Sequence, residues 1–184
     1  MKQQSNMAKS KLKPRGWFSP LTVLCMGLLC SSAFAQDKEL SVKDLGWIDR
    51  SHIQKQIDSI DEISRRNFGG GLHGTKQDLK LVQRIIDRSL IKRDDRLKLQ
   101  ALGAVLGQVL VNEEKLEWQN YEDKLGKSRA VCVPKTQHCL FPITMLSRRM
   151  EVGLLPRVDD VYKKAIERIE GHMPKNPYDV DSGR

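Results

Sequence analysis

Hydrophobic residues recur with a helical period in three stretches of the first 112 residues. Between Ser41 and Asn67, a spacing of three or four positions indicates one buried side of a helix of about twenty residues, formed by Ile53, Ile57, Ile60 and Ile63. The same spacing marks a second helix by Leu79, Val82, Ile85, Ile86 and Leu90, and a third by Leu99, Leu102, Val105, Leu106, Val109 and Leu110.

Glycine and polar residues mark the ends of these helices. The segment 69–74 holds four glycines, which disfavour continued helix, so a connector is expected there. Thr75 with Asp78 forms a loose capping pattern for the second helix, and either Asp94 or Asp95 can cap the third. Gly103 and Gly107 fall on one face of the third helix, which predicts close approach by another element of the domain, although helix dimerisation uses the same spacing.

The pattern changes after Val111 to short segments rich in aromatic and β-branched residues, separated by turn sequences. The segments 116–122, 127–133 and 138–146 therefore predict three antiparallel strands in a meander. Pro142 would lie in the last strand, where it has no N–H to donate and should face an edge or a bulge. A closing helix is expected over 160–170, capped by Asp159.

These elements predict an α+β fold: three N-terminal helices, a three-stranded antiparallel β-meander and a C-terminal helix. We expect a single domain over residues 36–173, followed by a flexible tail over 174–184 that holds few apolar residues.

The N-terminal 35 residues have the pattern of an export signal. Five basic residues and no acidic one precede an apolar stretch from Trp17 to Leu29, and Ala33-Phe34-Ala35 offers a cleavage site. We expect cleavage after Ala35 and a periplasmic or secreted bacterial protein. Two alternatives remain. The segment could be retained as a membrane anchor, although its apolar stretch is shorter than the roughly 20 residues of a membrane span. It could also be lipidated at Cys25 or Cys30.

Removing this signal changes the charge and the cysteine count. It takes five of the 32 basic residues and none of the 23 acidic ones, so the formal net charge falls from +9 to +4. Such a charge, scattered among acids, does not indicate nucleic-acid binding. Of the four cysteines, Cys132 and Cys139 remain, and in an oxidising compartment they are expected to form a structural disulfide across a turn rather than a redox pair.

Familiar catalytic and ligand motifs are missing from the sequence. The four histidines have no metal-ligand spacing, and residues 69–76 lack the Lys-Ser/Thr order of a phosphate-binding loop. We therefore expect no metal, no cofactor and, once the signal is cleaved, no membrane span.

The strand region holds the densest group of candidate binding residues. Arg148 and Arg149 follow an apolar segment and could bind a carboxylate or phosphate by forked hydrogen bonds, or instead pair with Asp123, Glu122 or Glu151. The candidate binding residues are Trp118, Tyr121, Asp123, Arg129, Arg148 and Arg149.

Several strings in this region resemble a known bacterial family. They are Leu102-Gly103-x3-Gly107, Trp118-x2-Tyr121-x-Asp123-x2-Gly126, and the run from Phe141-Pro142-Ile143-Thr144 through Arg148-Arg149-x3-Gly153. Together they are similar to proteins with domain of unknown function 3806, over about residues 97–169. The resemblance implies a compact α+β domain without an established activity, and the cysteine pair is not part of the family pattern.

Two functional hypotheses follow. The first is a non-catalytic binding or structural protein of the cell envelope, whose partner is an envelope protein or a cell-wall component. The alternative is a small envelope hydrolase with Glu122 or Asp123 as its base near Arg148 or Arg149, which requires a concave pocket with a carboxylate of perturbed pKa.

Overall fold

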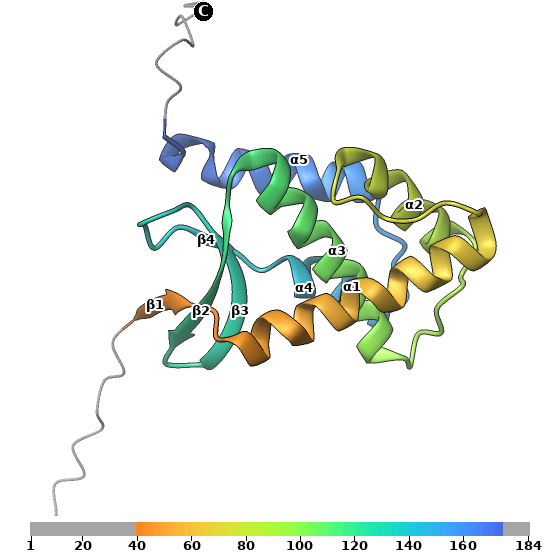
Figure 1. Cartoon of the computed structure of the whole chain (residues 1–184), viewed down its shortest axis with the longest axis horizontal. Coiled ribbons are helices and arrows are strands. Elements are labelled where there is room, and N and C mark those ends of the chain that lie inside the picture. The colour runs from red at the N-terminus through yellow and green to blue at the C-terminus, as the bar shows by residue number, and fades with distance from the viewer. Residues whose placement is uncertain (1–39, 175–184) are drawn as a thin grey trace, which may run out of the picture. The chain divides into compact units, whose positions relative to one another are not determined.

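The computed structural model describes residues 40–174, which form five α-helices, one 3₁₀ helix and a four-stranded sheet (Figure 1). The predicted signal peptide and, from residue 175 on, the predicted tail lie outside the described residues. In chain order the elements are β1 (Ser41–Asp44), α1 (Trp47–Phe68), α2 (Lys76–Asp87), α3 (Arg96–Glu114), β2 (Glu117–Asp123), β3 (Gly126–Cys132), β4 (Cys139–Leu140), α4 (Pro142–Glu151), α5 (Val158–Ile169) and η1 (Glu170–His172).

The predicted α+β class is confirmed, but the sheet has an additional strand at its start. Residues 41–44, which we assigned to the first helical stretch, form β1 and pair antiparallel with β2, Val42 opposite Tyr121. The helix α1 begins only at Trp47. All four strands lie in chain order within one antiparallel sheet, but three helices separate β1 from β2, so the meander itself consists of β2, β3 and β4.

The predicted third strand over 138–146 is wrong beyond its first residues. The strand β4 holds only Cys139 and Leu140, and α4 begins at Pro142. Proline is well suited to the first turn of a helix, because its fixed φ fits and its missing N–H has no intrahelical acceptor there. Pro142, Leu146 and Met150, at four-residue spacing, are buried along this helix, which therefore belongs to the core.

Among the five described α-helices, α3 alone begins with a side-chain cap. The cap that we expected from Asp159 is absent, because α5 begins at Val158 and Asp159 lies within its first turn. Asp95, one of the two predicted caps, accepts a hydrogen bond from the backbone N–H of Lys98 at 3.1 Å and starts α3. Thr75 precedes α2 but makes no side-chain cap. Instead the buried carboxylate of Asp78 accepts hydrogen bonds from the backbone N–H groups of His73 and Gly74, which holds the glycine-rich connector against α2.

The helix α3 is the centre of the core. Nearly every residue from Leu99 to Leu110 is buried, and Figure 1 shows α3 surrounded by α1, α2, α4 and α5, with the sheet at one end. The close approach predicted from Gly103 and Gly107 is confirmed within the domain. A Cβ on Gly103 would lie 2.5 Å from the Cα of Ile143, and one on Gly107 would lie 2.3 Å from the ring of Trp118.

The cysteine pair forms the predicted disulfide between neighbouring strands. Cys132 lies opposite Cys139 in the β3–β4 register, their sulfur atoms are 2.08 Å apart, and Val131 faces Leu140. The bond therefore closes the hairpin directly before Phe141 and α4.

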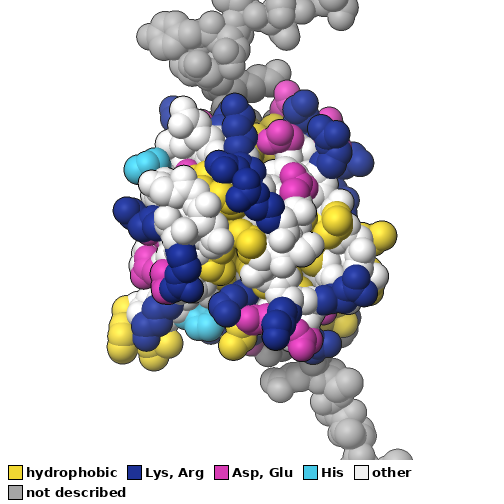
Figure 2. All heavy atoms as spheres, turned by 90° about the vertical axis from the view of Figure 1, so that its right-hand side faces the viewer, with side chains coloured by type: hydrophobic (Ala, Val, Ile, Leu, Met, Phe, Trp, Pro, Cys, Tyr) yellow, Lys and Arg dark blue, Asp and Glu magenta, His cyan; other side chains and the backbone are white. Residues whose placement is uncertain are grey.

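The surface carries both charges. On the face shown in Figure 2, Lys and Arg side chains are scattered with Asp and Glu side chains between them. Within residues 40–174, no helix combines the length and apolar character that crossing a bilayer requires.

Candidate functional site

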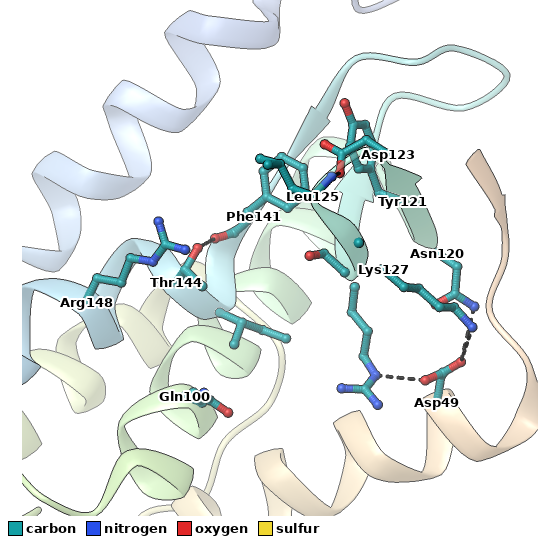
Figure 3. A pocket seen from close by; sticks show the side chains of 14 residues that line it. Asp49, Gln100, Asn120, Tyr121, Asp123, Leu125, Lys127, Phe141, Thr144 and Arg148 are labelled. Atoms are coloured by element: carbon teal, nitrogen blue, oxygen red, sulfur yellow. Dashed lines mark hydrogen bonds and ion pairs between the residues drawn. The ribbon is translucent and has the colours of Figure 1, made fainter. Parts of the chain in front are cut away.

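A partly open pocket of about 550 Å³ lies between the first turn of α1, the β2–β3 hairpin and the first two turns of α4 (Figure 3). Its size falls within the range of pockets that bind small ligands. The lining residues are Asp49, Gln100, Asn120, Tyr121, Asp123, Leu125, Gly126, Lys127, Ser128, Arg129, Phe141, Ile143, Thr144 and Arg148.

One side of the pocket is a charged network around Asp49 of α1. Its carboxylate accepts hydrogen bonds from Arg129 Nε at 3.0 Å and from Asn120 Nδ2 at 3.1 Å, and Lys127 Nζ lies 3.9 Å away. The pairing of β2 with β3 places Asn120 opposite Arg129, so both side chains reach the same carboxylate. This network anchors the start of α1 to the sheet.

These contacts also determine the protonation state of Asp49. The hydrogen bond from Asn120, with the hydrogen bond and charge of Arg129 and the charge of Lys127, lowers the pKa of Asp49 despite partial desolvation. A carboxylate with a lowered pKa stays ionised at neutral pH and is a weak proton acceptor. Asp49 is therefore suited to an ion pair and poorly suited to general base catalysis.

The middle of the pocket is aromatic and apolar. The rings of Tyr121 and Phe141 meet edge to face, with their centroids 5.0 Å apart. Leu125, at the tip of the hairpin, is 96% exposed although it borders the pocket. The turn holds this leucine in place because Asp123 Oδ1 accepts a hydrogen bond from the Leu125 N–H at 2.8 Å. An apolar group of a ligand would thus meet three apolar side chains.

Arg148 lies on the side of the pocket away from Asp49 (Figure 3). The helical spacing of four residues places it on the same face of α4 as Thr144, and both line the pocket. Among residues 40–174, Arg148 has no ion-pair partner. The predicted pairing with Glu151 does not occur, since Glu151 contacts Arg96 at 3.9 Å.

The remaining two predicted binding residues lie outside the pocket. The exposed Arg149 donates from Nη1 to the backbone carbonyl of Met145 on its own helix. Trp118 packs over Gly107 and donates from Nε1 to Gln108 Oε1 at 3.3 Å. The fold thus brings four of the six candidates to one pocket, namely Tyr121, Asp123, Arg129 and Arg148.

Several pocket residues were missed by the sequence reasoning. Asp49 is 71 residues from Asn120, and no motif links them. Phe141 and Ile143 were assigned to a strand, although the four-residue spacing of Pro142, Leu146 and Met150 was a signal for the helix that positions them. Along the described part of the chain, no three His, Cys, Asp or Glu side chains form a cluster suited to a metal ion.

Comparison with known proteins gives a family match over part of the chain and a fold. Residues 78–162 match the model of the family described as Domain of unknown function (DUF3806), a segment that starts and ends earlier than the resemblance in the sequence. No curated protein is significantly similar in sequence. A crystal structure of a protein from Bacteroides thetaiotaomicron has the same fold, with a TM-score of 0.63, 17% identity and 72% of this chain covered. The match spans about half (49%) of that protein's chain.

Proposed function

We propose that the protein is a non-catalytic binding domain of the bacterial cell envelope. The proposal starts from the pocket, because the family whose model matches residues 78–162 has a description that assigns no activity. In this proposal the pocket holds a segment or group of an envelope protein or a cell-wall component. The export signal expected in residues 1–35 supports the location.

The observation that carries the proposal is Arg148, an arginine that lines the pocket without an acidic partner in the described chain. Arg129, by comparison, is paired with Asp49 at 3.0 Å, so its charge is already balanced within the protein. Arg148 is exposed and has no such partner in the described chain. An arginine beside an aromatic pair supplies charge and apolar surface together, which is the combination that ligand pockets use for affinity and orientation.

The hydrolase alternative has less support. A general base works best with a pKa near the operating pH, which for a carboxylate requires an upward shift. The pKa of Asp49, an acidic residue of the pocket, is shifted downward instead. The hydrogen bond from Asn120 and the contacts with Arg129 and Lys127 lower it. Asp123 is engaged by the backbone of the hairpin turn.

Site-specific crosslinking tests the proposal. A photoreactive phenylalanine analogue replaces Tyr121 in the full chain, expressed in a bacterium, and the cells are irradiated before purification. A matched chain carries the analogue at Lys163, an exposed residue of α5 that does not line the pocket. We expect an adduct from position 121 and none from position 163.

Two arginine variants complete the design. Arg148→Ala should abolish the adduct from position 121, whereas Arg149→Ala, which removes an equal charge outside the pocket, should keep it. Circular dichroism verifies that both variants fold. The absence of an adduct at 121, or the same adducts from both positions, would refute a binding role for this pocket.

A further inference from the structure

We propose that the ligand of this pocket is a short peptide with an apolar last residue and a free C-terminal carboxylate. This inference rests on the proposed binding function and assigns the chemistry of the ligand. Three features of the pocket carry it: an arginine for the carboxylate, an apolar surface for the last side chain, and uncharged polar groups for the peptide backbone.

The carboxylate site is formed by α4. Arg148 offers a planar, always charged donor group that binds a carboxylate through two parallel hydrogen bonds. Ile143 and Thr144, in the first turn of the same helix, line the pocket as well. Arg148 itself lies in the last turn of α4, so its guanidinium is the group that gives this side of the pocket a preference for an anion.

The apolar site is bounded by Leu125, Tyr121 and Phe141. Leu125 is almost fully exposed in the unbound protein, and its place on the hairpin turn puts it at the pocket rim. A leucine in this position contributes nothing to the core, but it would be covered when an apolar side chain lies against the aromatic pair. Burial of both surfaces then favours binding.

The polar lining favours a peptide over a simple fatty acid. Gln100, Ser128 and Thr144 add uncharged polar side chains to the wall, and the pocket is partly open rather than a closed apolar tunnel. Arg129 contacts Asp49 through Nε, and its two terminal nitrogens make no hydrogen bond within the described chain. They are suitable donors for a peptide carbonyl, a group that a fatty acid lacks.

Calorimetric titration of the purified protein tests this assignment with defined probes. The probes are N-acetyl-trileucine with a free carboxylate, the same peptide with a C-terminal amide, and decanoate as a fatty acid. We expect the free acid to bind at least about 10-fold more tightly than the amide, because the amide loses a hydrogen bond between charged groups. It should also bind more tightly than decanoate.

Variants locate each contact. Arg148→Ala should weaken binding of the free acid by about 10-fold or more and leave binding of the amide unchanged. Arg149→Ala should preserve the full difference in affinity between the two peptides. Leu125→Ser should weaken both peptides by a similar factor. Leu154→Ser is its control, because Leu154 is 59% exposed and lies outside the pocket.

Two results would overturn the peptide assignment: equal affinity for acid and amide in the unaltered protein, or tighter binding of decanoate. Failure of both peptides to bind while the Arg148-dependent adduct at position 121 persists would also reject it, yet leave the binding function intact. Loss of that adduct, in contrast, rejects the binding function itself.

Discussion

Replacing Gly103 with alanine should destabilise the domain, although alanine is the better helix former. A Cβ at this position would lie 2.5 Å from both the Cα of Ile143 and the carbonyl oxygen of Pro142, and 2.6 Å from the oxygen of Ile143. All three are backbone atoms of the first turn of α4. No side-chain rotation can relieve the contact, so α4 itself must move away from α3.

The magnitude follows from two opposing terms. Alanine in a helix interior gains about 1 kcal/mol over glycine. Overpacking a core costs about 1 to 3 kcal/mol, and the upper end applies here because the neighbour is backbone. The net loss is therefore about 2 kcal/mol, which lowers Tm by roughly 6 to 10 °C in a domain of this size.

Gly107→Ala is the matched comparison for Gly103→Ala. Its Cβ would meet the ring of Trp118 at 2.3 and 2.4 Å, and Pro142 Cγ at 2.8 Å, so a side chain is the main obstacle. In a Trp118→Phe background the cost of Gly107→Ala should fall by about 1 kcal/mol, as for other contacting pairs. The cost of Gly103→Ala should stay the same in that background.

Urea unfolding followed by circular dichroism measures the free energy of unfolding of the six proteins in the two double-mutant cycles. We expect coupling in the cycle of positions 107 and 118, and none in the cycle of positions 103 and 118. A Gly103→Ala protein as stable as the unaltered one would refute the reasoning, since α4 would then have no fixed distance from α3.

Three other experiments test separate features. Asp95→Ala should cost about 1 kcal/mol through loss of the α3 cap, while Asp94→Ala should cost little; thermal melts compare them, and equal effects would contradict the capping role. The Cys132–Cys139 bond closes a loop of eight residues, so its reduction should lower the free energy of unfolding by at most about 2 to 3 kcal/mol, the chain-entropy value. Urea unfolding with and without reductant measures this loss. A larger loss would show that the disulfide also maintains native packing. Because the pKa of Asp49 is lower in the folded protein, its carboxylate stabilises the fold above about pH 4 and loses this effect as the pH falls through the folded pKa. Asp49→Asn should therefore be less stable at pH 7 and lose less stability on acidification to pH 3.5, and parallel acid sensitivity of the two proteins would contradict the ion-pair network.

Local pattern was sufficient for part of the fold. The three N-terminal helices follow from the spacing of their apolar residues, and the pairing of Cys132 with Cys139 follows from their places on either side of a turn. The two glycines of α3 also predicted a close neighbour. In each case, residues near one another in the chain carry the signal.

The pocket could be predicted only in part. Tyr121, Asp123, Arg129 and Arg148 were suspected because the segment 118–149 is dense in aromatic and charged residues, and the fold brings these four together. Trp118 belongs to the same aromatic and charged segment, but its side chain faces α3, where it fills the space over Gly107. Composition does not say which face of a strand becomes the pocket wall.

By itself, then, the sequence determined the α+β class, the main helices, the disulfide and the family resemblance, since each depends on the spacing of nearby residues. Only the tertiary structure decided that residues 41–44 join the sheet and that Asp49 binds Asn120 and Arg129. These features depend on contacts between distant segments, whose burial and pairing energies outweigh weak local preferences. For the same reason Arg148 lacks an acidic partner within the described residues: the packing of α4 on α3 sets its position beside the pocket.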